Sequence, residues 1–193
     1  MQNRQAKMVR YFGYGTNRDH DMMAAMIGRN NLLGVPGKLP GYELCIQALS
    51  DIPDVVAERA PVSLSPREIV GRAFGSSFEV YVTRPNPGSV AYGTIWDITS
   101  EELKLVHEWE LLDFGMQNEM KATAVGSDGE AVDVDTHGLQ NPDTPVNRVV
   151  SGDDYVDYLV PREDILRVAN EVRLEYLARI SAIDSAREEC KSE

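Results

Sequence analysis

The stretch YFGYGTN, residues 11–17, places two glycines between aromatic side chains at the end of a run rich in strand-forming residues. The run MVRYF, 8–12, predicts a strand, and DHDMMAAMIG, 19–28, predicts a short helix with Asn17 or Asp19 as its N-cap. Strand, glycine loop and helix together present backbone N–H groups to a ligand. The loop therefore raises the question of what its backbone binds.

Two familiar nucleotide-binding motifs do not fit this loop. A dinucleotide fingerprint needs a third glycine after Gly13 and Gly15, but Arg18 stands in its place, and no Gly-Lys-Ser/Thr sequence of a P-loop follows. Two interpretations remain: a small site that holds a carboxylate or carbonyl oxygen by backbone donors, or a plain tight turn. From this loop alone, the turn is the better supported.

The bulk composition limits the class of protein. A chain of 193 residues with 42% hydrophobic and 26% charged residues is typical of one soluble globular domain. The formal net charge of −12 disfavours nucleic acids and anionic membranes as partners. The sequence contains neither a signal peptide nor about 20 consecutive apolar residues, so we expect a cytoplasmic protein. Its two cysteines and three histidines lack disulfide or metal-site spacing, so we expect no metal.

Strands and helices follow one another without regular β-α-β alternation, which predicts a single α+β domain over residues 1–193. Residues 1–7 are expected to be flexible. The expected strands are 42–49, then 77–85 and 89–99 as a hairpin around Asn-Pro-Gly, and a pair within 120–137.

Two further segments have open roles. Residues 50–77 are punctuated by Pro, Ser and Gly, with one helical turn near 65–74, and predict either a selectivity lid or a surface loop. Residues 161–189 predict a long C-terminal helix beginning at Pro161. Its apolar stripe could pack on the body or on a partner, including a second copy in a homodimer, and we favour the body. The stripe consists of Ile165, Val168, Val172, Leu174 and Leu177.

One carboxylate falls on an unexpected helix face. Thr99 and Glu102 form a capping-box pair that starts a helix over 99–112, and Glu110 projects inside or beside its apolar stripe. Burial raises the pKa of a glutamate, and a glutamate so tuned can act as a general acid/base. The alternatives are a side chain that bends out to water or one that pairs with a core arginine.

Loop and helix together resemble the γ-glutamylcyclotransferase family. YFGYGTN is similar to its motif Y-F-A-Y-G-S-N, while LPGYEL, 39–44, and VAYGTIWDIT, 90–99, are similar to its later turn and strand. In LVHEWELL, 105–112, Glu110 matches the glutamate of the L-D-x-x-E pattern, with His107 in place of Asp. Leu111 stands where a glycine often follows that glutamate, a common later Tyr is missing, and 50–77 is longer than the usual connection.

The resemblance implies a fold and a reaction. The fold is a mixed β-sheet or small barrel flanked by helices, with a long C-terminal helix. The reaction is attack by the α-amine of a γ-glutamyl amide on its own γ-carbonyl, releasing 5-oxoproline and an amine, with Glu110 as general acid/base and without a cofactor. The resemblance assigns the substrate contacts to Tyr11, Phe12, Gly13, Tyr14, Gly15, Thr16, Asn17 and Tyr155, with Tyr158 as a rival to Tyr155.

Two other functions remain open on these residues. One is a non-catalytic small-molecule binding protein on the same fold. The other is an acidic interaction protein that assembles through its C-terminal helix. The sequence leaves open the identity of the leaving amine, which could be an amino acid, a peptide, a polyamine-type amine or a biosynthetic intermediate.

Overall fold

The computed structural model describes residues 6–189, and within them it has six strands and four α-helices. The strands are β1 (Met8–Gly13), β2 (Gly34–Ala48), β3 (Glu79–Thr99), β4 (Asn118–Gly126), β5 (Ala131–Gly138) and β6 (Arg148–Val150). The helices are α1 (His20–Ile27), α2 (Pro66–Phe74), α3 (Ser100–Trp109) and α4 (Arg162–Glu189). Most of the predicted flexible stretch 1–7 lies outside the described residues.

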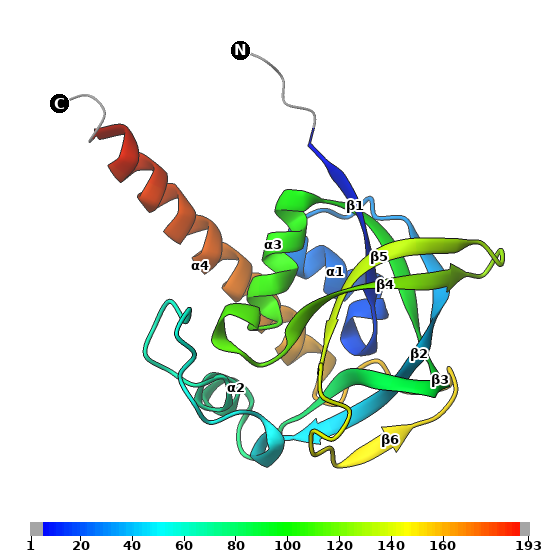
Figure 1. The fold of residues 1–193 in the computed structure, drawn as a ribbon. Helices are drawn as coiled ribbons and strands as arrows, with labels where there is room; N and C mark the ends of the chain where they lie inside the picture. Colours follow the sequence, from blue (N-terminus) through cyan, green and yellow to red (C-terminus); the bar gives the residue numbers. More distant parts are fainter. Residues whose placement is uncertain (1–5, 190–193) are drawn as a thin grey trace.

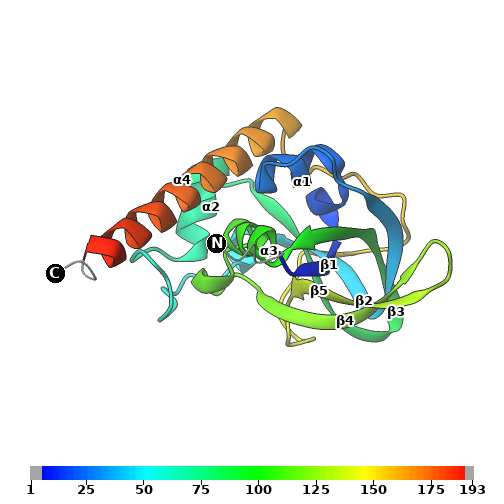
Figure 2. The same ribbon diagram turned by 90° about the horizontal axis from the view of Figure 1, so that it is seen from above.

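The strands form a closed, mixed sheet. Their order is β3-β1-β5-β4-β2-β6, and an additional β3–β2 pairing joins the ends of the first five strands into a small barrel. All neighbours are antiparallel except β1 and β5, which pair in parallel at Tyr11 and Asp135. The four helices lie together on one side of the barrel (Figures 1 and 2). The predicted α+β fold with a small barrel is confirmed.

The predicted hairpin around Asn-Pro-Gly is wrong, because β3 runs as one strand through that sequence. Both halves of β3 pair antiparallel with β2, and the register slips between Pro40, opposite Val90, and Tyr42, opposite Pro85. The residues between Pro85 and Val90 therefore form an irregularity in a continuous ladder instead of a reversal. The partner strand β2 likewise begins at Gly34 instead of Tyr42, so tertiary pairing overrides the Pro and Gly turn signals.

Successive residues of β1 serve two different cores. Tyr11 belongs to the cluster between the barrel and helices α1, α3 and α4, together with Met22 and Trp96. Phe12 belongs to the cluster inside the barrel, to which all five barrel strands contribute. This alternation follows from the two-residue period of a strand. The end of β1 that leads into the glycine loop is therefore buried on both faces of the strand.

The apolar stripe of helix α4 packs on the body only at its beginning, although Tyr176 still packs against the helical core and Arg179 pairs with Glu108 of α3. Ile165 and Ala169 are buried against the helical core, whereas Leu174 is 52% and Leu177 is 45% exposed. The C-terminal end of the helix projects beyond the body (Figure 1). The predicted packing therefore holds for the beginning of the stripe and is wrong for its last two residues.

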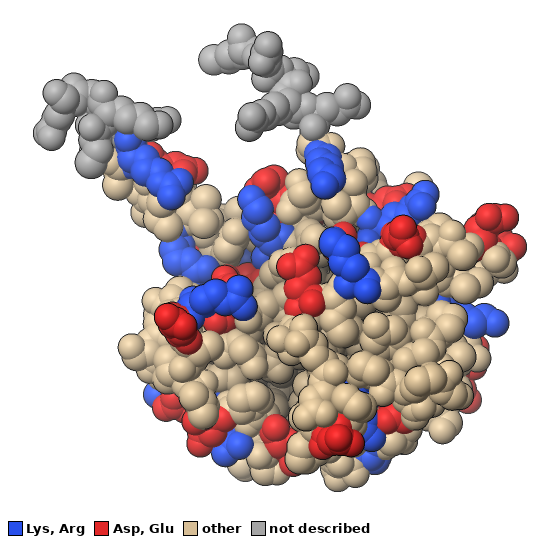
Figure 3. Space-filling model, viewed as in Figure 1, with Lys and Arg blue, Asp and Glu red and all other residues tan. Residues whose placement is uncertain are grey.

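The surface carries both signs of charge. On the face shown in Figure 3, Lys and Arg are interspersed with Asp and Glu over the barrel and helices. Among residues 6–189, no helix combines the length and apolar character that a membrane crossing requires.

Candidate active site

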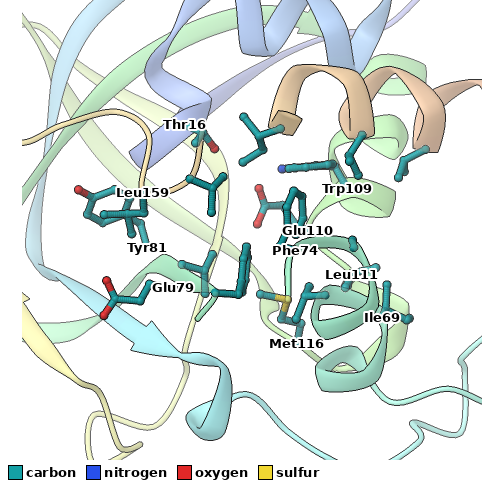
Figure 4. Close-up of a pocket in the computed structure, with 18 of the residues that line it drawn as sticks. Thr16, Ile69, Phe74, Glu79, Tyr81, Trp109, Glu110, Leu111, Met116 and Leu159 are labelled. Atoms are coloured by element: carbon teal, nitrogen blue, oxygen red, sulfur yellow. The ribbon is translucent and has the colours of Figure 1, made fainter. Parts of the chain in front are cut away.

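Glu110 sits at the point where α3 ends. It follows the last helical residue, Trp109, and its N–H still donates to the carbonyl of Val106 at 2.9 Å. The next residue, Leu111, takes a left-handed backbone conformation with φ 52° and ψ 39° and turns the chain away. Glu110 as a whole residue is only 7% exposed. Its carboxylate points into a cavity (Figure 4), so the inward projection expected from the helix pattern is present.

Three side chains hold the Glu110 carboxylate from the barrel side. Asn17 Nδ2 donates to Oε1 at 2.6 Å, and Gln117 Nε2 donates to Oε2 at 3.0 Å. His137 Nε2 lies 3.2 Å from the same Oε2. They come from the loop after β1, from the chain just before β4, and from β5. Segments far apart in sequence thus converge on one carboxylate.

Burial sets the protonation of this cluster. It raises the pKa of Glu110 to about 7, and the hydrogen bond from Asn17 opposes that rise. Burial also lowers the pKa of His137 to about 3, so the imidazole is neutral near pH 7. Glu110 can therefore exchange a proton near neutral pH while its neighbour stays uncharged, which is the requirement for a general acid/base.

A chain of hydrogen bonds fixes the His137 tautomer. Asn17 Nδ2 donates to the Tyr11 hydroxyl at 2.8 Å, and that hydroxyl lies 3.1 Å from His137 Nδ1. Because Nε2 faces the Glu110 carboxylate, which only accepts when it is ionised, the ring proton lies on Nε2, and Nδ1 accepts a hydrogen bond from the Tyr11 hydroxyl. The ionised carboxylate then accepts three hydrogen bonds, a pattern that favours its charged form.

Tyr14 braces the same cluster from a second direction. Its hydroxyl lies 2.8 Å from Gln117 Oε1 and 3.1 Å from the His137 carbonyl oxygen. Burial, and after it the charge of Glu110, raise the pKa values of both Tyr14 and Tyr11, so both stay protonated. Tyr14 also lines the cavity, whereas Tyr11 reaches Glu110 only through Asn17 and His137.

The two loop glycines are required by the fold itself. A Cβ on Gly13 would lie 2.4 Å from the Asn17 carbonyl oxygen, and one on Gly15 would lie 2.8 Å from the Tyr81 ring. Gly15 also has φ +56°, which glycine adopts at little cost. The loop is folded tightly against its own neighbours, and Trp96 Nε1 donates to the Asn17 carbonyl at 2.8 Å.

The amides of this loop are not all available. The Gly15 N–H donates to the Tyr155 hydroxyl at 3.1 Å, and the Asn17 N–H donates to the Tyr14 carbonyl at 3.1 Å. The N–H of Thr16, a residue that lines the cavity, donates to no atom of the described residues. Thr16 therefore offers the backbone donor beside Glu110.

The remaining predicted contacts lie behind the loop. The Tyr155 hydroxyl donates to the Tyr92 carbonyl at 2.8 Å, and the Arg18 guanidinium lies 3.8 Å over its ring. Tyr158 instead donates to Asp19 at 2.9 Å, at the N-terminus of α1. Tyr155 therefore supports the loop from outside the cavity. Phe12 faces the barrel interior, away from Glu110.

The cavity in front of Glu110 has a volume of about 140 Å³. Beyond the carboxylate, its walls come from α2, the start of β3, the end of α3 and the first half of α4 (Figure 4). Their apolar members include Phe74, Phe78, Trp109, Met116 and Val168. Residues 50–77, the expected lid or surface loop, supply four wall positions through α2. The segment is thus part of the cavity wall.

Similarity to known proteins is found by comparing structures and not by comparing sequences. No protein-family model and no curated protein matches the sequence. A structure of the uncharacterized human protein loc79017 matches with a TM-score of 0.53 at 14% identity, over 91% of this chain and 88% of that chain. A structure described as a gamma-glutamyl cyclotransferase matches with a TM-score of 0.52 at 13% identity, over the same shares. This chain therefore has the γ-glutamylcyclotransferase-like fold that its motifs predict.

Proposed function

We propose that this protein is a γ-glutamyl cyclotransferase, which converts a γ-glutamyl amide into 5-oxoproline and a free amine. The observation that carries the proposal is the buried Glu110 carboxylate, whose pKa of about 7 suits proton transfer and which lines a cavity beside the β1 loop. The fold and the loop motif support the same reaction class, although fold alone does not assign activity.

The mechanism begins with a proton. The α-amine of the substrate arrives as an ammonium, and ionised Glu110 accepts one of its protons. The freed nitrogen attacks the γ-carbonyl carbon of the same molecule, closing a five-membered ring. Because nucleophile and electrophile already share one molecule, holding the folded-back conformer supplies much of the rate. Protonated Glu110 then returns that proton to the departing nitrogen as the original C–N bond breaks. The ring nitrogen gives up its second proton through the ionised Glu110, and the amine leaves as an ammonium beside the neutral lactam of 5-oxoproline.

The surrounding residues have separate roles in this proposal. The free Thr16 N–H is placed to bind an oxygen of the γ-glutamyl group, either its α-carboxylate or the oxyanion that forms at the γ-carbonyl. Asn17, Gln117 and His137 keep Glu110 in one rotamer and stabilise its charged form. Tyr11, Tyr14 and Tyr155 act as positioning residues: the first two brace Glu110, and the third holds the loop at Gly15.

The test is the replacement of Glu110. We expect Glu110→Gln to lower 5-oxoproline release by roughly 10²- to 10⁴-fold, the usual contribution of a general acid/base. The assay is a panel of γ-glutamyl compounds with 5-oxoproline as the readout. Glu43→Gln is the matched control, since Glu43 is also buried but pairs with Arg84 outside the cavity. It should retain the wild-type rate.

The alternatives predict other outcomes. An unchanged rate in Glu110→Gln would remove Glu110 from the mechanism. A non-catalytic binding protein would bind γ-glutamyl compounds with no 5-oxoproline formed by either the wild-type protein or the Glu43→Gln control. Calorimetric titration of the same panel separates binding from turnover.

A further inference from the structure

The cavity wall has an uneven charge composition. Among the described residues that line it, the charged side chains are Glu79, Glu108 and Glu110, and neither Lys nor Arg contributes. His137 is neutral because burial lowers its pKa to about 3. A carboxylate on the leaving group, which would lie away from the Thr16 N–H proposed for the γ-glutamyl group, would therefore find no cationic side chain in the wall.

The two carboxylates other than Glu110 are already paired. Glu79 Oε2 lies 3.2 Å from Arg148 Nη2, and Glu108 Oε2 lies 2.8 Å from Arg179 Nη2. Both arginines lie outside the cavity lining. Because the two arginines neutralise Glu79 and Glu108 from outside the cavity, these glutamates attract an ammonium group on the bound molecule only weakly. Neither sign of charge on the bound molecule is thus well matched.

The rest of the wall suits an apolar body. Phe74 and Phe78 stack with ring centroids 5.0 Å apart, and Trp109, Met116 and Val168 complete a largely apolar enclosure. Figure 4 shows the Glu110 carboxylate between Thr16 on one side and Phe74 and Met116 on the other. A γ-glutamyl group held at Thr16 would thus direct its leaving group toward the aromatic and aliphatic side of the cavity.

We propose, on the basis of the proposed cyclotransferase activity, that the leaving group is a neutral, apolar amine, either alkyl or aromatic, without a carboxylate. Burying such a body releases water from apolar surface on both partners. An amino acid or peptide leaving group would bring a carboxylate into a cavity whose described lining offers it no cationic partner, and a buried unpaired charge is costly. The substrate class is therefore the γ-glutamyl amides of apolar amines.

Two matched substrates test the assignment. γ-Glutamyl-phenethylamide and γ-glutamyl-phenylalanine differ only by the carboxylate on the leaving group. We expect kcat/KM for 5-oxoproline release to be at least tenfold higher for the phenethylamide. A third compound, the mono-γ-glutamyl amide of 1,5-diaminopentane, carries a cationic leaving group and should also be at least tenfold poorer.

A variant at the cavity rim should reverse the preference. Ala73 is exposed on α2 and lines the cavity, so Ala73→Arg adds a cation there with little demand on folding. It should raise kcat/KM for γ-glutamyl-phenylalanine relative to the phenethylamide by roughly tenfold. Ala73→Gln adds a long polar side chain without charge and should leave the ratio near its wild-type value.

The results separate this inference from the proposed function. Equal or better turnover of γ-glutamyl-phenylalanine, or of the diaminopentane conjugate, overturns the inference while supporting the activity. Absence of 5-oxoproline from every compound overturns the activity. The selectivity is then judged by calorimetric titration of Glu110→Gln: tighter binding of the phenethylamide supports the apolar assignment, and equal or weaker binding overturns it.

Discussion

The two sides of Glu110 are built from different parts of the chain and differ in chemistry. The side toward the barrel consists of Asn17, Gln117 and His137, each within 3.2 Å of a carboxylate oxygen. The side toward the helices is the cavity, lined by apolar residues of α2, α3 and α4. The first side holds the charge in place, and the second excludes water from it.

The difference shows how one carboxylate obtains an intermediate pKa. The apolar side and burial favour the neutral acid, and the donors of the polar side favour the carboxylate. The balance is a pKa of about 7, with burial as the larger influence. The difference between the two sides also separates their tasks. Changes on the polar side should alter the ionisation of Glu110, and changes on the apolar side should alter which substrate is bound.

Removing the Glu110 charge, by Glu110→Gln, should give the largest change in the free energy of unfolding. The folded pKa of Glu110, about 7, lies above its ordinary value of 4.5, so the folded state binds an extra proton between those values. The free energy of unfolding therefore falls as pH rises through that window. Glu110→Gln lacks this loss, so its stability relative to the wild type should rise by about 2 to 3 kcal/mol from pH 5 to pH 8.

Urea unfolding at both pH values measures this difference. The opposite titration of His137, whose folded pKa is about 3, contributes to both proteins and cancels in the comparison. A constant stability difference across the range would mean that Glu110 ionises as it does in the unfolded chain. The polar side would then outweigh the burial supplied by the apolar side.

Weakening the polar side alone should give an intermediate effect. Gln117→Leu removes one donor to Glu110, a hydrogen bond to a charged group of the kind worth about 1.5–3 kcal/mol. The pKa of Glu110 should rise further, moving the acid limb of the kcat/KM profile up by about one pH unit. Gln47→Leu is the matched control, because Gln47 is fully buried on β2 and does not line the cavity.

The two variants are compared by their pH–rate profiles with the phenethylamide substrate. An upward shift in Gln117→Leu alone would locate the effect in the Gln117–Glu110 hydrogen bond. The same shift in Gln47→Leu would point to a general loosening of the fold. An unmoved profile in Gln117→Leu would mean that this donor does not stabilise the ionised Glu110.

The sequence predicted the elements on which local signals act strongly. The capping box of Thr99 and Glu102 forms, and α3 starts where it indicates. Asp19, one of two candidate caps, caps α1 with its side chain. The other candidate, Asn17, turns to Glu110 instead, because a buried carboxylate needs a donor more than an exposed helix end does.

Other features could not be read locally because they depend on closure of the barrel. Alternation in β5 puts His137 on the same face as Asp133 and Asp135, which indicates a solvent-facing side chain. Only the pairing of β1 with β5 buries it beside Tyr11. Likewise, Gln117 lies in irregular chain before β4 and has no periodicity to mark it. The Asn-Pro-Gly sequence favours a turn, but pairing with β2 keeps it in strand β3.

The smallest predicted effect lies at Leu111, where the chain passes from the polar to the apolar side. Its side chain is buried and lines the cavity, yet its φ of 52° belongs to a region that favours glycine. Leu111→Ala and Leu111→Gly both lose the buried side chain and should both be destabilised. The Gly variant should nevertheless be about 1 kcal/mol more stable than the Ala variant, because glycine adopts this conformation without strain.

The same pair of changes at Leu112 gives the control for this backbone effect. Leu112 is similarly buried but has no positive φ, so there the Ala variant should be the more stable of the two. Thermal or urea unfolding of the four variants provides the comparison. If Ala were also favoured at 111, the left-handed turn would not be fixed by the fold. If glycine is favoured only at 111, the leucine there lines the cavity at the expense of backbone strain. The apolar side of Glu110 then includes a residue that the local backbone conformation disfavours.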